Sequence, residues 1–295
     1  MKFLIDILKG MVIGLANIIP GVSGGTMMVS MGIYDTLIYC ITHLFKQFKK
    51  SVLTLLPFFI GMIAALVILS NVITWALTDS FASLPTNTLF IGLILGGLPA
   101  ILKQLKGSKK QDGILGGVLF VAFFALVIYL ATLKETQDTG MVISLSVLEF
   151  VKLFFMGCVA SATMVIPGVS GSMMLMLMGY YYPVVGAIKN LMSALVALNG
   201  SAILYNIGIL LPFGIGVVVG IFAIAKLIEV LLAKWKCITY GAILGLVVAS
   251  PFAILMGLNL PGFNLVQVIV SIVTFIVGFA AAWLLARKDE KPAAA

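Results

Sequence analysis

A six-residue motif that occurs twice carries the residue types best suited to chemistry in this chain. Ile-Pro-Gly-Val-Ser-Gly occupies residues 19–24 and again residues 166–171, and the two copies start 147 positions apart. Proline ends an incoming helix, glycine permits close or left-handed backbone, and serine can cap the helix that follows. The free N–H groups at a helix N-terminus attract anions. Each copy therefore predicts an anion-binding turn, and the pair predicts a shared site for one anionic group such as a phosphate.

The candidate phosphate ligands are the polar residues and glycines of the two turns and their flanks. They are Asn17, Pro20, Gly21, Ser23, Gly24, Gly25, Thr26, Pro167, Gly168, Ser170, Gly171 and Ser172. The first copy is the more polar one, because Asn17 aligns with Met164 and Thr26 aligns with Met173. The alternative interpretation is that both turns only let helices pack closely. Two matched breaks at membrane depth leave backbone groups unpaired at a high cost, which favours a functional role.

Residues 21–25 read Gly-Val-Ser-Gly-Gly, which also fits the G-x-S-x-G pattern of a serine nucleophile. That motif needs a preceding strand and a histidine partner. The surrounding sequence is helical in character, and the one histidine, His43, stands near a lysine cluster. The sequence shows no carboxylate pair, metal-ligand spacing or phosphate-binding P-loop elsewhere. It therefore predicts a protein that is not an enzyme and that has no metal or cofactor.

The composition is that of an all-α polytopic membrane protein. Of 295 residues, 62% are hydrophobic and 9% are charged, whereas about a quarter of the residues in a soluble domain are charged. The net charge of +8 does not indicate nucleic-acid binding, because the basic residues lie in short connections between apolar runs, as in cytoplasmic loops. Cys40, Cys158 and Cys237 lack paired spacing and are expected to be packing residues. The sequence leaves the oligomeric state open.

The elements that must position the two turns form two repeats. Residues 10–34 and 157–181 align without gaps and are identical at 12 of 25 positions. The first repeat is predicted at residues 1–140, with a re-entrant helical hairpin at 3–34 and transmembrane spans at 53–77, 88–106 and 113–133. The second is predicted at 141–288, with a hairpin at 149–182, spans at 201–228, 237–257 and 264–286, and a tail at 289–295. Three spans per repeat is an odd number, so the repeats are expected to have inverted topology.

The lysines predict the orientation of these spans. Lys46, Lys49 and Lys50 precede the first span, and further basic residues follow at 103–110, 226–236 and 287–291. Basic loops lie on the cytoplasmic side, so both termini are expected in the cytoplasm and the second hairpin is expected to enter from outside. Asp6 and Lys9 lie at the edge of an apolar segment, where they are expected to reach the head-group region or to form a local ion pair.

The doubled motif resembles that of the bacterial and archaeal polyprenyl-phosphate transporter family, long catalogued as a domain of unknown function. Gly-Leu-Ala-Asn at residues 14–17 before the first copy and Gly25-Thr26 after it add to the resemblance. The resemblance covers nearly the whole chain. It implies a plasma-membrane protein that translocates undecaprenyl phosphate, the lipid carrier of envelope polymers, from the outer to the inner leaflet. Its partners would be a polyprenyl phosphate lipid and the surrounding membrane lipids, and residues 20–26 and 167–172 would be the family's signature turns.

Inward movement of a phosphate opposes a negative-inside potential by about 2.3 kcal/mol per charge per 100 mV. Proton coupling would reduce the charge that is moved, and Asp35 and Asp6 are the candidate proton carriers. Three alternatives stay open at this point. They are a transporter or channel for a small soluble anion, a membrane enzyme acting on the lipid phosphate, and a purely structural scaffold.

Overall fold

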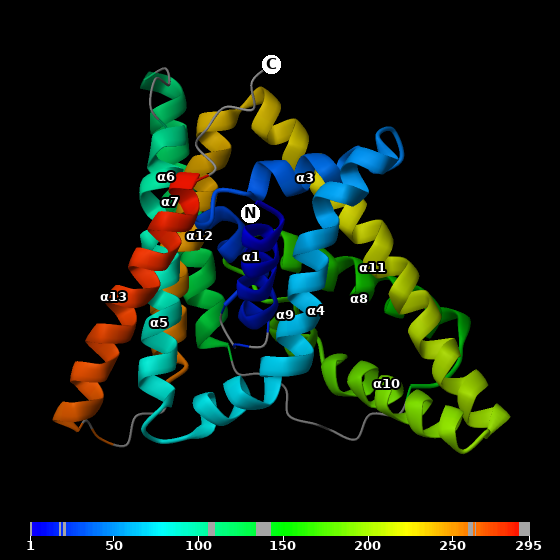
Figure 1. The fold of residues 1–295 in the computed structure, drawn as a ribbon. Helices are drawn as coiled ribbons and strands as arrows, with labels where there is room; N and C mark the ends of the chain where they lie inside the picture. The colour runs from blue at the N-terminus through cyan, green and yellow to red at the C-terminus, as the bar shows by residue number, and fades with distance from the viewer. Residues whose placement is uncertain are drawn as a thin grey trace. The chain divides into compact units, whose positions relative to one another are not determined.

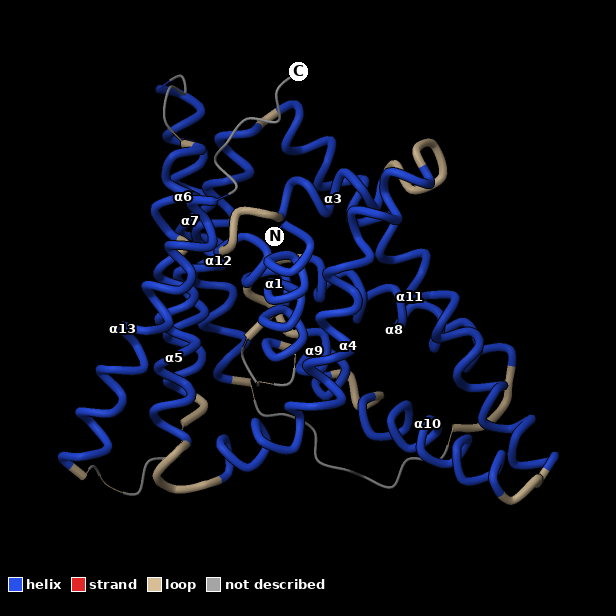
Figure 2. The backbone as a smooth tube through the Cα atoms, viewed as in Figure 1, coloured by secondary structure: helices blue, strands red, loops and turns tan. Residues whose placement is uncertain are grey.

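The structure is a computed structural model, and it describes residues 2–17, 19, 22–105, 110–133, 143–258, 262 and 264–288. Every regular element in these residues is an α-helix (Figure 2), which confirms the all-α prediction. The chain packs as two compact units. Unit 1 comprises Met1–Thr132, Ile166–Val169 and Ala225–Ala295, and unit 2 comprises Leu133–Val165 and Ser170–Ile224.

Each copy of the doubled motif separates two helices. In the first half, α1 (Lys2–Ala16) is followed by α2 (Gly24–Ser30) and α3 (Tyr34–Thr42). In the second half, α8 (Val147–Val165) is followed by α9 (Gly171–Leu177) and α10 (Tyr181–Val196). The turns after α2 and α9 also correspond, because Gly32 and Gly179 have φ values of +70° and +76° at equivalent positions. A left-handed residue after a helix is normally glycine, since a side chain there is strained.

The remaining helices are apolar, and all of them except the seven-residue α6 are long. They are α4 (Phe48–Thr78), α5 (Ser83–Gly96), α6 (Leu98–Gln104), α7 (Lys110–Thr132), α11 (Gly200–Lys234), α12 (Lys236–Met256) and α13 (Leu265–Lys288). Within the described residues, seven segments are long and apolar enough to cross a membrane. Six of them overlap the spans expected from sequence. The seventh is α8, which was expected as the incoming arm of the second hairpin and whose 19 residues extend roughly 28 Å.

Within unit 1, helix α5 of the first half packs along helix α13 of the second half (Figure 1). A Cβ atom added at Gly92 would lie 2.2 Å from the carbonyl oxygen of Phe275, and one added at Gly96 would lie 2.3 Å from that of Phe279. Only glycine permits this approach of two backbones. Because both partners advance by four residues in the same direction, the two helices run parallel.

Helices α12 and α7, also in unit 1, form the corresponding pair with the halves exchanged. A Cβ atom at Gly241 would lie 2.4 Å from the carbonyl oxygen of Gly116, and one at Gly245 would lie 2.3 Å from that of Phe120. These helices are parallel by the same reasoning. In both pairs, glycines on the middle helix of one half contact the last helix of the other half, so the two halves are interleaved.

The first helix of each hairpin makes an equivalent contact within its own unit. In unit 1, a Cβ atom added at Gly10 of α1 would lie 2.2 Å from the carbonyl oxygen of Phe58 in α4. In unit 2, one added at Gly157 of α8 would lie 2.2 Å from that of Phe213 in α11. Phe58 and Phe213 each follow a proline inside their helix. The internal duplication therefore extends from the turns to the contacts that hold the helices together.

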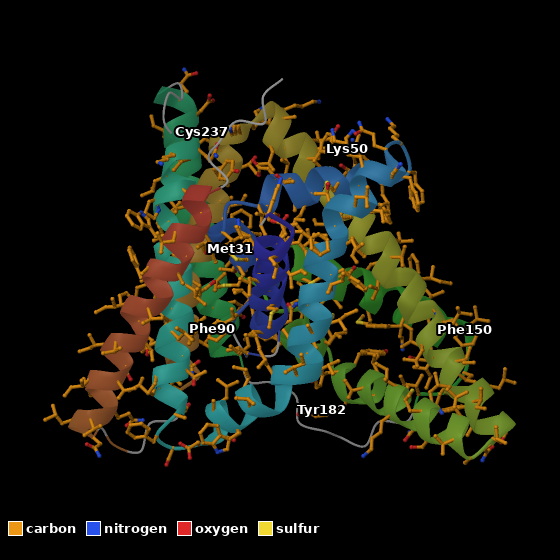
Figure 3. The ribbon with its side chains drawn as sticks, viewed as in Figure 1. Met31, Lys50, Phe90, Phe150, Tyr182 and Cys237 are labelled. Carbon is orange, nitrogen blue, oxygen red and sulfur yellow. The ribbon has the colours of Figure 1, made fainter. Side chains whose placement is uncertain are left out.

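The outer surfaces of the long helices are apolar. Val67 of α4 is 74% exposed and Leu204 of α11 is 72% exposed, and many other large hydrophobic side chains project from these helices (Figure 3). A soluble protein rarely exposes apolar patches on this scale. Exposed apolar side chains on helices long enough to cross a bilayer identify a multi-pass membrane protein.

Candidate functional site

The first signature turn starts helix α2. Ser23 is the N-cap residue, with an extended backbone, and its Oγ accepts a hydrogen bond from the N–H of Gly25 at 3.2 Å. Ser23 is 2% exposed and Thr26 is fully buried, and Gly24 and Gly25 are buried as well. Pro20 and Gly21 lie outside the described residues. The predicted cap is confirmed, but its hydroxyl groups face protein rather than solvent.

The second signature turn differs from the first at its serine. Gly168 has φ +81°, and a Cβ atom there would lie 2.6 Å from the carbonyl oxygen of Leu246, so both the conformation and the space require glycine. Ser170 is the N-cap residue of α9, but its side chain does not cap the helix. Its Oγ instead lies 2.9 Å from the Oγ of Ser172. The expectation that serine caps the following helix is therefore wrong for the second copy, where the Ser170 hydroxyl pairs with the Ser172 hydroxyl instead.

Unit 1 brings parts of the two turns into direct contact. The Ser23 hydroxyl donates to the carbonyl oxygen of Ile166 at 3.3 Å. The N–H of Gly168 donates to Oγ1 of Thr26 at 2.7 Å. Side chains of the first turn thus bind backbone groups of the second turn, across 143 and 142 residues of sequence. Ser23, Thr26 and Gly168 are predicted ligands of one anion, and in this structure they form hydrogen bonds between the two turns instead.

Asn17 gives the first turn an accessible polar group. It is exposed, and a Cβ atom added at Gly24 would lie 2.9 Å from its Oδ1. The equivalent contact in unit 2 is apolar, because a Cβ atom at Gly171 would lie 2.6 Å from Cγ of Met164. In each repeat the same two positions lie close together, Asn17 with Gly24 and Met164 with Gly171. The first pair is polar and the second is apolar, as the alignment of the two repeats indicates.

Asp6 and Lys9 are inside unit 1 and not at its surface. Lys9 is fully buried and Asp6 is 9% exposed. Lys9 Nζ donates to the carbonyl oxygen of Met31, just after the end of α2, at 3.4 Å (Met31 is labelled in Figure 3). The expectation that these charges reach the head-group region is wrong, because α1 is covered by its neighbours at this level. A buried ammonium group is costly unless it is paired or hydrogen-bonded.

Asp35 is paired with a residue that sequence reasoning did not single out. The Tyr240 hydroxyl lies 2.8 Å from both carboxylate oxygens of Asp35. Both residues line a cavity of about 50 Å³, together with Tyr34 and Gln104. Burial raises the pKa of Tyr34, so its phenol stays protonated. The partner could not be found in the sequence, because 205 residues separate Asp35 from Tyr240.

The proton-carrier candidates and the signature turn lie at opposite ends of α2. Ser23 precedes this helix, and Asp35 follows it. Lys9, which is one helical turn from Asp6, donates to the carbonyl oxygen of Met31 just after the helix ends. Seven helical residues extend roughly 10 Å. Among the residues that the structure describes, no group of three His, Cys, Asp or Glu side chains could hold a metal ion. The groups positioned by α2 are therefore hydroxyls and backbone N–H groups at one end and ionisable side chains at the other.

Comparison with known proteins gives consistent matches. Residues 13–262 match the VCA0040-like family, described as undecaprenyl phosphate translocase-like. The chain is 36% identical over 285 residues to a polyprenyl-phosphate transporter of Staphylococcus aureus, covering 96% of each protein. It is 29% identical over 264 residues to a polyprenyl-phosphate transporter of Vibrio cholerae, covering 85% of this chain and 77% of that protein. No solved structure matches the chain.

Proposed function

We propose that this chain, which belongs to the undecaprenyl phosphate translocase-like family, moves a polyprenyl phosphate between the leaflets of the membrane. The observation that carries the proposal is the contact between the two signature turns, Ser23 to Ile166 and Thr26 to Gly168. The relatives named polyprenyl-phosphate transporters support the substrate. The direction is proposed as outer to inner leaflet, which would return the lipid carrier for reuse, in a plasma membrane.

The head group would replace the contact between the turns. Phosphate oxygens are strong acceptors, and the contact contains two suitable donors, the hydroxyl of Ser23 and the N–H of Gly168. A charge-assisted hydrogen bond is roughly twice as strong as a neutral one, so a phosphate competes well against the Ile166 carbonyl and the Thr26 hydroxyl. The exposed amide of Asn17 is the first polar group that an arriving head group would meet. Ser170, Gly171 and Ser172 remain predicted members of the site on sequence grounds.

Movement would follow from inverted repeats that change their packing. Helices α12 and α13 are consecutive, so as successive crossings they run in opposite directions. Helix α13 is parallel to α5. Helix α5 is the middle helix of the first half and is equivalent to α12, the middle helix of the second half. Equivalent helices of the two halves would then be antiparallel, which is the inverted arrangement of many secondary transporters. In this scheme the lipid tail stays in the bilayer while the head group passes between the turns.

The charge of the head group sets the energetic requirement. A phosphate monoester carries roughly −1.5 to −2 at pH 7 and has a second pKa near 6. Inward movement against the membrane potential costs about 2.3 kcal/mol per charge per 100 mV. We propose that protons offset part of this cost and that Asp35, held by Tyr240 beyond the end of α2, carries one. Asp6, a buried residue of α1, is the second candidate proton carrier.

A serine pair within one hairpin provides the direct test. Ser23→Ala removes the hydroxyl that contacts Ile166, whereas Ser30→Ala removes an equally buried hydroxyl that donates to Ile94 at 3.3 Å, away from the turns. Each variant is reconstituted in proteoliposomes, and the movement of a labelled polyprenyl phosphate between leaflets is measured. The proposal predicts that Ser23→Ala slows transport at least about tenfold, as loss of a hydrogen bond to a charged group implies, while Ser30→Ala retains it. Equal rates in both variants would remove Ser23 from the site.

A further inference from the structure

The turn between α3 and α4 exposes aromatic and basic side chains together. Phe45 and Phe48 are 81% and 63% exposed. Lys46, Lys49 and Lys50 are exposed as well, and Lys50 is labelled beside this turn in Figure 3. These five side chains form what we term the 45–50 surface. Two phenylalanines among three lysines suit a partner that has both an apolar part and an anionic part.

The 45–50 surface lies where the chain enters the membrane. The membrane-spanning segment of α4 begins at Phe48. Helix α3 packs against α4 and runs across its direction (Figure 1). The apolar face of α3 is buried in unit 1 and consists of Tyr34, Leu37, Ile38 and Cys40. Because α3 crosses α4 at the point where the span begins, α3 and the turn lie along the membrane surface, at the depth of the lipid head groups.

Hydrogen bonds fix the turn from its inner side. The N–H groups of Lys46 and Gln47 donate to the carbonyl oxygen of His43 at 3.1 and 2.9 Å. The Gln47 Nε2 donates to the Tyr39 hydroxyl at 3.2 Å, and the Tyr39 ring stacks on His43 with 4.1 Å between the ring centroids. The backbone of the turn is therefore ordered, while the phenylalanines and lysines project from it.

The positive charge of the surface is not balanced by the protein. Residues 43–50 contain no acidic residue. The acidic side chain that reaches the turn, Glu229 of α11, places Oε1 3.3 Å from Nδ1 of His43, and its Oε2 accepts from Lys226. Among the residues that the structure describes, none forms an ion pair with a lysine of the 45–50 surface. The three ammonium groups are therefore available to an anion from outside the chain.

We propose that the 45–50 surface binds an anionic phospholipid of the leaflet in which it lies. The lysines hold the phosphate of the head group, and the phenylalanines contact the start of the acyl chains. Basic loops mark the cytoplasmic side, so this leaflet is expected to be the inner one. Each lysine close to an anionic membrane surface strengthens binding about fivefold. The site is separate from the signature turns, because α2 and α3 lie between them.

Lipid binding to the full-length chain is measured by native mass spectrometry in a neutral detergent, with phosphatidylglycerol or phosphatidylcholine added. The proposal predicts that phosphatidylglycerol binds at least about tenfold more tightly than phosphatidylcholine. Lys46→Gln combined with Lys49→Gln should weaken the binding of phosphatidylglycerol at least about tenfold, since two charges are lost. Phe45→Ser combined with Phe48→Ser should weaken it as well, although it leaves the charge unchanged.

The matched control is Lys152→Gln combined with Lys189→Gln. These lysines are exposed on α8 and α10 of unit 2, so the control removes the same charge away from the 45–50 surface and should retain binding. Equal affinity for the two phospholipids, or an equal loss in both pairs of lysine variants, would overturn the proposal. It would also be overturned if the variants at 46 and 49 kept phosphatidylglycerol but lost polyprenyl phosphate, which would assign the surface to the transported lipid.

Discussion

Thr26 makes one of the two hydrogen bonds described between the signature turns. Oγ1 of Thr26 accepts the N–H of Gly168 at 2.7 Å, and both groups are buried. Thr26→Val keeps the shape of the side chain but leaves that N–H without an acceptor, which costs about 1–3 kcal/mol. We expect Thr26→Val to lower the free energy of unfolding in detergent by this amount, whereas Thr132→Val, at an exposed hydroxyl that donates to the Tyr129 carbonyl within α7, should change it little. An unchanged stability would show that the contact does not hold the turns.

Asp35 governs the predicted response of transport to pH. A proton that Asp35 passes on would accompany the phosphate, whose second pKa is near 6. Transport should therefore be faster at about pH 6 than at about pH 8. Asparagine at this position cannot carry a proton, so in Asp35→Asn the ratio of the two rates should fall toward the value that protonation of the phosphate alone would give. Asp79→Asn is the matched control, because Asp79 caps the turn before α5 through Phe81 and Ala82, and asparagine caps equally well. A pH ratio that is the same in wild type and Asp35→Asn would exclude this residue as a proton carrier.

Glycines allow two helix pairs of unit 1, α5 with α13 and α12 with α7, to pack backbone against backbone. Gly92 leaves no room for a side chain, because a Cβ atom there would lie 2.2 Å from a backbone oxygen of α13. Gly92→Ala must therefore separate α5 from α13, and we expect a loss of several kcal/mol, at the upper end of overpacking effects of about 1–3 kcal/mol. Gly117 in α7 has no atom within 4 Å of its added Cβ. There the same substitution should stabilise the helix by about 0.5–1 kcal/mol, since alanine is the better helix former. Thermal unfolding of the two variants gives the comparison, and equal shifts would contradict the packing account.

The proposed inverted repeats and the basic loops predict how the chain lies in the membrane. Gln47, just before α4, should lie on the cytoplasmic side, and Ser80, between α4 and α5, should lie outside. Single cysteines introduced at these two positions, in a background without Cys40, Cys158 and Cys237, should react with a membrane-impermeant thiol reagent from opposite sides of the membrane. Labelling of both positions from the same side would contradict α4 as a full crossing.

Much of the helical organisation could be predicted from the sequence, because proline, glycine and charge mark helix ends locally. The break between α1 and α2 and the split at Gly97 between α5 and α6 coincide with such residues. The burial of Lys9 could not be predicted, since a lysine near the end of an apolar run has the same local pattern at a surface. The pairing of Tyr240 with Asp35 and the contact of Thr26 with Gly168 join distant segments. Such contacts depend on how the two halves interleave, which hydrophobic periodicity does not encode.

The proposed function requires that the moving molecule is a lipid and that its head group is recognised at the two turns. The most direct measurement compares two substrates in the same proteoliposomes: the movement of labelled polyprenyl phosphate between leaflets and the entry of labelled inorganic phosphate into the lumen. If the chain translocates the lipid, lipid movement should depend on the protein, and phosphate entry should not exceed that of empty liposomes. Phosphate entry without lipid movement would contradict it and would make the chain a carrier or channel for a small soluble anion.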